Sequence, residues 1–93
     1  MTEKNMVQNG GLPAAYFVDS SYSGSHVSKR FGKKLRSLRK ERQLTQEEMS
    51  RLFGIDRSFI SDVERGVRSM SLHTLEVVAI GMNLSLSELL RNI

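Results

Sequence analysis

The 93-residue sequence contains no cysteine. Disulfide bonds and thiolate metal sites are therefore excluded. The two histidines, His26 and His73, lie far apart in the sequence and do not form a His-x-x-x-His pair. Because neither ligand pattern is present, we expect the chain to bind no metal and no cofactor.

Long apolar runs are also missing from the sequence. The apolar run in the first 28 residues covers only residues 14–18, which is too short for a signal peptide or a membrane span. With the lack of cysteine, this favours a cytoplasmic protein that has no membrane partner. The chain also lacks a Ser/His/Asp or Cys/His set, a Gly-x-x-x-x-Gly-Lys loop and catalytic-looking carboxylate clusters, so we predict no catalytic residues and no enzyme activity.

Positive charge is abundant in the second part of the chain. The formal net charge is +4, and residues 29–93 contain 13 Lys or Arg against 8 Asp or Glu. The densest stretch, residues 29–42, contains eight Lys or Arg and one Glu. Such a run is either a solvated helix face or a surface that attracts a polyanion by phosphate contact and counterion release. Charge alone does not separate these two interpretations.

Residues 1–28 differ in composition from the rest of the chain. They contain Asn9-Gly10-Gly11, one proline and a serine-rich stretch at residues 20–25. This composition predicts a flexible N-terminal arm over residues 1–28, followed by one domain over residues 29–93. The apolar island at residues 15–18 can pack on that domain as a short strand or turn.

The pattern from Lys29 onward is helical. Phe31, Leu35 and Leu38 recur at i, i+4 and i+7, so the first predicted helix has one apolar face. Thr45 and Glu48 are spaced as a capping box, which predicts the start of a second helix. The inward positions predicted for this second helix are Met49, Leu52 and Phe53.

Three further boundaries are marked by capping residues. Gly54 permits the positive φ of a tight turn, and Asp56 is the predicted N-cap of a third helix. Ser71 is the predicted cap of a fourth helix, and Ser85 with Glu88 forms a second capping box. The predicted core positions of the third and fourth helices are Ile60, Val63, Leu72, Leu75, Val78, Ala79 and Met82, and the last short helix is predicted to run through Leu89 and Leu90. Five helices with short connections predict an all-α bundle.

The second and third predicted helices form a helix-turn-helix unit over residues 45–65. A tight joint at residues 54–56 lets the two helices cross steeply and share one small core. The outward face of the third helix then carries short or hydrogen-bonding side chains: Arg57, Ser58, Ser61, Asp62 and Arg65. A helix with this slim polar face fits the major groove of DNA.

The sequence over residues 31–90 resembles the Cro/C1-type (XRE) helix-turn-helix family. The carrying motifs are Leu-Arg-Ser-Leu-Arg at 35–39, Leu-Thr-Gln-Glu-Glu-Met at 44–49, Ser-Phe-Ile-Ser-Asp-Val-Glu-Arg-Gly at 58–66 and Leu-Ser-Leu-Ser-Glu-Leu at 84–89. The resemblance implies a five-helix, lambda-repressor-like fold that binds double-stranded DNA. Within the family, residues 56–72 look most like controller proteins of restriction–modification systems, and Met70 stands where many phage repressors have proline.

The resemblance also implies roles for individual residues. Four side chains match positions that face base edges: Arg57, Ser58, Ser61 and Asp62. Three match positions that contact the DNA backbone: Gln46, Arg65 and Arg68. Lys33 and Arg36 are added as candidate phosphate contacts. Arg57 can bind guanine with two hydrogen bonds, and Asp62 can accept one from cytosine.

Several of these residues have a structural alternative. Asp62 can instead form an ion pair with Arg57 or Arg65 on its own helix. Gln46 can be an ordinary helix residue, and Phe59 can pack in the core instead of touching the sugar–phosphate edge. For Glu64 we expect a structural ion pair with an arginine of the first helix, such as Arg39.

Two residues depart from the family pattern. Gln43 stands where many relatives have glycine, so it must adopt another exit geometry or a positive φ. Gly81 lies inside the fourth helix, where it costs about 1 kcal/mol unless close packing requires it. Asn83 is expected to take the left-handed exit position after this helix.

Apolar residues late in the chain predict a two-fold dimer. The interface residues are Val77, Ile80, Leu84, Leu90 and Ile93. The alternative is that Tyr16, Phe17 and Val18 of the arm fold back over this patch. A dimer would place its recognition helices about 34 Å apart, on a near-palindromic operator.

The functional prediction is a dimeric transcription regulator of the controller type. The alternatives are a phage or mobile-element repressor, an antitoxin-type repressor, or a protein-interaction module that uses the same bundle. A contact with RNA polymerase is left open, because the sequence does not identify a surface for it.

Overall fold

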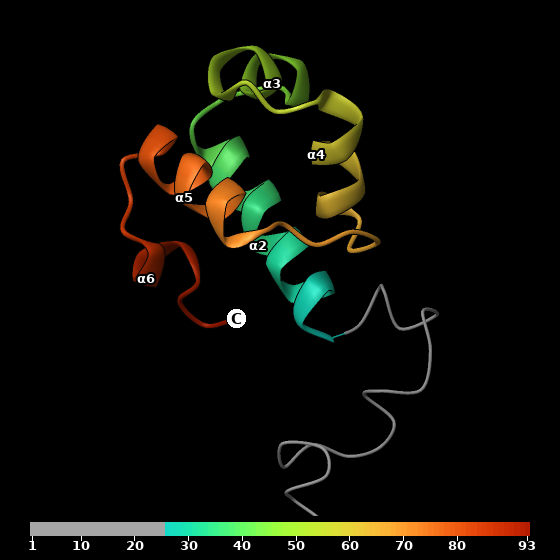
Figure 1. Cartoon of the computed structure of the whole chain (residues 1–93), viewed down its shortest axis with the longest axis vertical. Coiled ribbons are helices and arrows are strands. Elements are labelled where there is room, and N and C mark those ends of the chain that lie inside the picture. Colours follow the sequence, from blue (N-terminus) through green and yellow to red (C-terminus); the bar gives the residue numbers. More distant parts are fainter. Residues whose placement is uncertain (1–25) are drawn as a thin grey trace, which may run out of the picture.

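The computed structural model describes residues 26–93, which form five helices joined by short loops (Figure 1). The helices are α2 (His26–Glu41), α3 (Gln46–Phe53), α4 (Arg57–Glu64), α5 (Leu72–Gly81) and α6 (Leu86–Leu89). The all-α fold class is therefore confirmed. The predicted arm lies outside the described residues, except for its last three.

The first helix begins three residues earlier than the predicted domain boundary at Lys29. Ser28 explains the earlier start, because it is buried in the first turn and its hydroxyl lies 3.1 Å from that of Ser69. This hydrogen bond joins the start of α2 to the loop that follows α4. Residues 26–28 are thus part of the folded domain.

Two capping boxes begin α3 and α6, as predicted. The Thr45 hydroxyl accepts from the Glu48 backbone N–H at 3.0 Å, and the Glu48 carboxylate accepts from the Thr45 N–H at 2.8 Å. Ser85 and Glu88 form the same pair of bonds at 3.0 and 2.8 Å. Side-chain oxygens also cap the other two predicted starts, at Asp56 and Ser71. These bonds satisfy backbone donors that a helix start leaves without partners.

The predicted left-handed positions are also present. Gly54 ends α3 with φ +71°, and an added Cβ would meet nothing within 4 Å, so backbone conformation alone favours glycine there. Gln43 and Asn83 both have φ +58°. Gln43 therefore takes the positive-φ alternative, and Asn83 takes the exit position expected of it.

The helices surround one core, with α2 running through the middle of the bundle (Figure 1). Helix α4 packs on α2 and α3, while α5 packs on α3 and α6. The buried apolar side chains are Phe31, Leu35, Met49, Ile60, Val63, Val78, Ala79, Met82 and Leu89. Each large member contributes about 1.5–3 kcal/mol by leaving water.

Two core predictions are wrong. Leu52 is 61% exposed, because Met49 and Phe53 occupy the inward side of the short helix α3. Leu72 is 78% exposed. It shares helical spacing with Leu75, but it stands on the first turn of α5, beyond the edge of the core. Leu90, which the sequence assigns to an exposed apolar patch, is 38% exposed on the helix end that follows the buried Leu89.

The glycine inside α5 is explained by packing. A Cβ built on Gly81 would lie 2.6 Å from a ring carbon of Phe53, which is closer than atoms can approach. Glycine at this position therefore lets the Phe53 ring of α3 lie directly against the α5 backbone. Close packing therefore requires glycine at this position, which is the condition under which a glycine inside a helix was expected to be favoured.

Candidate nucleic-acid interface

Helix α4 has one buried side and one polar side. Ile60 and Val63 are fully buried, which fixes the orientation of the helix on the core. The opposite side carries Arg57, Ser58, Ser61, Asp62 and Arg65. Of these five, both arginines and Ser58 are exposed, whereas Ser61 and Asp62 are half-buried. The structure thus brings all four predicted base-contact residues onto one helix face.

A close approach of two backbones positions α4 against α2. A Cβ on Gly32 would lie 2.4 Å from the Val63 carbonyl oxygen and 2.7 Å from that of Glu64. Only a residue without a side chain permits this approach. Sequence reasoning missed Gly32, and a glycine within the regular apolar spacing of the first helix is the signal that points to such a contact.

A buried ion pair joins the same two helices. Arg39 Nε donates to Glu64 Oε2 at 2.7 Å, and Nη2 donates to Oε1 at 2.9 Å. The side chains are only 10% and 3% exposed, so the predicted structural role of Glu64 is confirmed. Its hydrogen bond to the Arg39 guanidinium also raises the pKa of that group above its usual value. Arg39 Nη1 further donates to the Leu44 carbonyl at 2.7 Å, which fixes the loop before α3.

Gln46 is a third member of this cluster. Its amide nitrogen donates to Glu64 Oε1 at 3.1 Å, so one carboxylate joins α2, α3 and α4. The side chain is half-buried and engaged within the protein. The Gln46 backbone N–H, at the first position of α3, can contact a phosphate without breaking this bond.

Asp62 forms ion pairs along its own face. Its carboxylate accepts from Arg65 at 2.5 Å, and Arg68 Nη1 lies 4.0 Å from the other oxygen. Asp62 therefore forms its ion pair with Arg65 and not with Arg57, the other arginine that the spacing allows. Among residues 26–93, Arg57 takes part in no ion pair, and its side chain is exposed at the start of α4.

Ser58 contributes to the cap of α4. Its hydroxyl donates to Asp56 Oδ2, the same oxygen that accepts from the Phe59 backbone N–H at 3.2 Å. The Ser58 hydroxyl and the Phe59 N–H hold the pKa of Asp56 below its usual value. Phe59 is half-buried against the core, and the Arg68 guanidinium lies 4.9 Å from its ring centroid. Phe59 thus packs, and it supports Arg68 by a cation–π contact.

Lys33 and Arg36 lie on a basic stripe of α2. Both are exposed, and helical spacing places them in line with two further exposed cations, Lys29 and Lys40. The stripe adjoins the face that packs on α4, because Lys29 touches the position of Gly66 just after α4. Sequence reasoning counted Lys29 and Lys40 in the basic stretch 29–42 but did not name them as phosphate contacts, although the spacing i, i+4, i+7, i+11 identifies them. The stripe therefore extends the positive charge beside α4.

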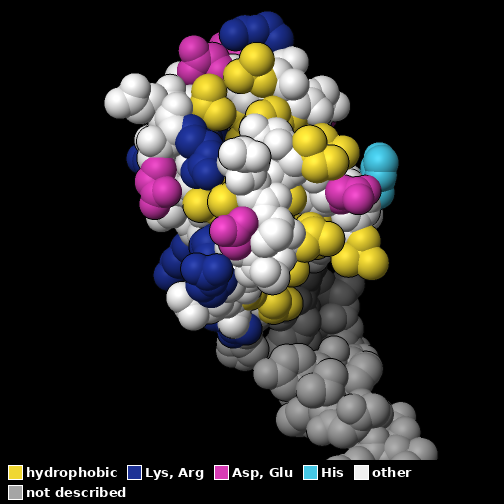
Figure 2. Space-filling model, turned by 90° about the vertical axis from the view of Figure 1, so that its left-hand side faces the viewer, with side chains coloured by type: hydrophobic (Ala, Val, Ile, Leu, Met, Phe, Trp, Pro, Cys, Tyr) yellow, Lys and Arg dark blue, Asp and Glu magenta, His cyan; other side chains and the backbone are white. Residues whose placement is uncertain are grey.

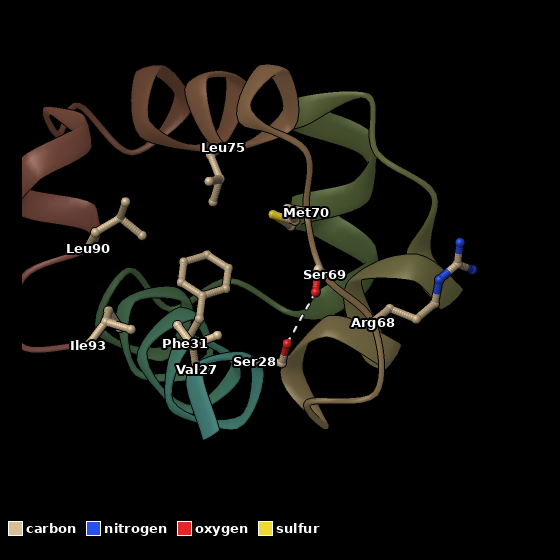
Figure 3. A pocket seen from close by; sticks show the side chains of 9 residues that line it. All are labelled: Val27, Ser28, Phe31, Arg68, Ser69, Met70, Leu75, Leu90 and Ile93. Carbon is tan, nitrogen blue, oxygen red and sulfur yellow. Dashed lines mark hydrogen bonds between the residues drawn. The ribbon is translucent and has the colours of Figure 1, made fainter. Parts of the chain in front are cut away.

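The predicted dimer residues do not share a single surface. Figure 2 views the α5–α6 side of the molecule, where hydrophobic side chains gather in a band. Ile80 is 72% exposed, and Val77 is half-buried. Leu84 and Ile93 pack against the core. Ile80 is rotated about 140° around α5 from Leu75. Leu75 points toward the Phe31 ring, in a groove that Leu90 and Ile93 also line (Figure 3).

Residues 26–93 lack two further features. None of the helices there combines the length and the apolar character that crossing a membrane would require. The same residues contain no group of three or more His, Asp or Glu side chains arranged to hold a metal ion.

Comparison with known proteins agrees with this geometry. The sequence profile of the helix-turn-helix family HTH_3 matches residues 35–89, which include α3 and α4. The control protein C.MunI of a Mycoplasma species is 43% identical over 65 residues, which cover 69% of this chain and 88% of that protein. The immunity repressor protein of Bacillus phage phi105 is 38% identical over 56 residues, covering 60% and 39% of the two chains.

Among solved structures, the fold is similar to that of the restriction-modification controller protein C.AhdI from Aeromonas hydrophila. The TM-score is 0.64 at 39% identity, and the match covers 67% of this chain and 94% of that one. The polar face of α4, the buried support beneath it and the family match over more than half of the sequence lead to one conclusion: this chain belongs to the helix-turn-helix family of DNA-binding regulators.

Proposed function

We propose that the protein is a controller-type transcription regulator of a restriction–modification system that reads duplex DNA with α4. The observation that carries the proposal is the exposed polar face of α4, held rigidly by Gly32 and by the Arg39–Glu64 pair. Two similar proteins, C.MunI and C.AhdI, are named as control or controller proteins. As such a regulator, the protein would act in the cytoplasm and bind upstream of its own gene.

Base recognition is assigned to Arg57, Ser58, Ser61 and Asp62. Arg57 leads this set because it is exposed at the start of α4 and has no ion-pair partner in residues 26–93. Two parallel hydrogen bonds from a guanidinium to guanine contribute about 1–3 kcal/mol of discrimination. Asp62 already binds Arg65, so it reads a base only by sharing or releasing that partner.

Backbone contacts are assigned to Gln46, Arg65, Arg68, Lys33 and Arg36. Arg65 and Arg68 are 64% and 59% exposed at the end of α4 and just beyond it. Gln46 contributes its backbone N–H at the start of α3, and the α2 stripe supplies the remaining charge. Such contacts position the protein on DNA and make binding depend on salt.

The active form is proposed to be a two-fold dimer on a near-palindromic operator. Ile80, with Val77 beside it on α5, is the centre of the proposed interface, because this large apolar side chain is 72% exposed. Ile80→Glu should give a monomer by sedimentation, whereas Leu72→Glu at the exposed start of the same helix should not. Unchanged mass for Ile80→Glu would contradict this assembly.

The second candidate is a repressor of the phage type. It is favoured by the similarity to the phi105 immunity repressor, although that match spans only 39% of the phage protein. Both candidates bind DNA through α4, so the neighbouring genes separate them. A methyltransferase–endonuclease pair supports the controller, and a block of phage genes supports the repressor.

A binding titration tests the shared mechanism. The protein is titrated against the DNA upstream of its own gene and against scrambled DNA, at two salt concentrations. We expect tight, salt-sensitive binding with a preference for the upstream DNA. Arg57→Ala should remove the preference, while the control Arg91→Ala, on the α6 side of the molecule, should retain it. Equally weak binding to all DNA would overturn the regulator and favour a protein-interaction module.

A further inference from the structure

An apolar groove lies on the side of the bundle formed by α2, α5 and the residues after α6 (Figure 3). Its volume is about 230 Å³. Six apolar side chains line it: Val27, Phe31, Met70, Leu75, Leu90 and Ile93. In Figure 3 the Phe31 ring lies near the middle of the group, and Leu75 points toward it from α5.

The groove is held open by the fold. Lys34 Nζ donates to the backbone carbonyls of Glu88 and Arg91 at 3.3 and 2.7 Å, which fixes the chain end against α2. The two serines of the lining, Ser28 and Ser69, bond to each other and thereby satisfy their hydroxyls. The groove therefore offers an occupant almost entirely apolar surface.

Part of this surface remains in contact with water in the described domain. Val27 is 53% exposed and Leu90 is 38% exposed, at the mouth of the groove. Covering such side chains contributes about 25 cal/mol for each Å² removed from water. The volume is below the roughly 300–1,000 Å³ of small-molecule sites, so it suits one or two large side chains.

The chain itself supplies such side chains close by. The N-terminal residues join α2 beside Val27, which lines the groove. Their one apolar run is at residues 14–18 and includes Tyr16 and Phe17. Eight residues separate Val18 from Val27, and the segment between these two positions spans up to about 30 Å, enough to return to the groove. Tethering also gives the run a high effective concentration there.

Charge favours the same occupant. The first 25 residues contain Glu3 and Asp19 against Lys4, whereas residues 29–93 carry 13 Lys or Arg against 8 Asp or Glu. Asp19 directly follows the apolar run, and the exposed Arg91 stands between the groove residues Leu90 and Ile93. An acidic group beside the bound rings would therefore meet a cation at the rim.

We propose that this groove is the docking site of the chain's own residues 14–18, which place the rings of Tyr16 and Phe17 against it. The docked segment covers the exposed parts of Val27 and Leu90 and joins the N-terminal residues to α2 and to the end of the chain. Docking is intramolecular and does not depend on the proposed function in transcription.

Tyrosine fluorescence tests this directly, because the chain has two tyrosines and no tryptophan. In Tyr22→Phe, all emission comes from Tyr16. We expect acrylamide to quench Tyr16 at least about threefold less in this folded protein than in urea, because the docked ring is shielded. Adding Phe17→Ser should abolish the protection. Equal quenching in the folded and unfolded states would overturn the proposal.

A groove variant shows where the segment docks. Val27→Glu, in the Tyr22→Phe background, places a charge at the groove mouth. It should still fold, because position 27 is half exposed and an acidic residue suits the first turn of a helix. If acrylamide quenches Tyr16 more strongly in this variant while the circular dichroism spectrum is unchanged, the segment docks in the groove. Protection that persists in both Val27→Glu and Leu90→Glu would place the segment elsewhere and refute the site.

A spin label distinguishes the chain's own segment from that of a second copy. Because the sequence has no cysteine, Ser20→Cys gives one labelling position. We expect a nitroxide there to broaden the methyl signals of Val27, Leu90 and Ile93 within the same chain. If broadening instead required mixing labelled chains with separate isotope-enriched chains, the occupant would be a second copy and the intramolecular proposal would fail.

Discussion

Arg39 of α2 and Glu64 of α4 form two hydrogen bonds, at 2.7 and 2.9 Å, beneath the polar face of α4. Glu64 also accepts from Gln46 of α3. One carboxylate thus fixes three helices relative to each other. The geometry of the interface depends on this cluster, although none of its ion-paired side chains points toward the solvent.

Arg39→Ala should lower the free energy of unfolding by about 3 kcal/mol, because it leaves the Glu64 carboxylate buried without its charge partner. The matched control is Glu41→Ala. This variant removes an ion pair in which Arg42 Nη1 and Glu41 Oε1 lie 3.9 Å apart and the Glu41 side chain is 69% exposed. It should lower the free energy of unfolding by less than about 1 kcal/mol. Urea unfolding measures both changes. A cost for Arg39→Ala no greater than that of the control would show that the pair contributes little.

Gly81→Ala should destabilise the domain even though alanine favours helices. The propensity gain is about 1 kcal/mol. Against it, the new Cβ would lie 2.6 Å from the Phe53 ring, and overpacking of this kind costs about 1–3 kcal/mol. The melting temperature of Gly81→Ala should therefore fall. Phe53→Leu in the same chain should recover part of the loss, and a rise in melting temperature for Gly81→Ala alone would contradict the clash.

Acid should weaken the start of α4 through Asp56. The Ser58 hydroxyl and the Phe59 N–H lower the folded-state pKa of this carboxylate, so the unfolded chain binds the proton more readily. The stabilisation is present above the unfolded pKa of about 3.9 and is lost as the pH falls through the lower folded value. Asn is also a good N-cap but does not titrate. Melting curves from pH 7 to pH 3 should show a shallower decline for Asp56→Asn, and an unchanged slope would exclude this contribution.

Local signals correctly predicted the starts of the four helices that follow α2. Thr45 and Asp56 accept hydrogen bonds from backbone N–H groups three residues further on, so their role as helix caps can be inferred from the adjacent sequence. Leu52 and Leu72 were placed wrongly because periodicity gives the face of a helix but not where the adjoining helix stops covering it. Tertiary packing decides that limit, and sequence spacing does not contain it.

In the candidate site, too, local spacing predicted some features, and tertiary packing decided the others. The outward face of α4 follows from helical spacing, so its members could be predicted together. The choice of Arg65 over Arg57 as the partner of Asp62 depends on side-chain geometry, which the spacing leaves open. The apolar groove could not be predicted at all, because it joins residues from the first turn of α2 to the last residue of the chain.

The basic stripe of α2 should control how strongly binding depends on salt, and not which sequence is bound. Lys33 and Arg36 are exposed beside α4, where each can neutralise one phosphate. Each lost contact lowers the magnitude of the slope of log K against log salt concentration by about 0.9, so replacing both with alanine should lower it by about 1.8. Upstream and scrambled DNA should lose affinity equally in titrations at several salt concentrations. Arg91→Ala, which removes one exposed cation on the α6 side of the molecule, serves as the control and should leave the slope unchanged. If the double variant instead lost its preference for upstream DNA at an unaltered slope, α2 would have to read bases, and the assignment of base recognition to α4 alone would be wrong.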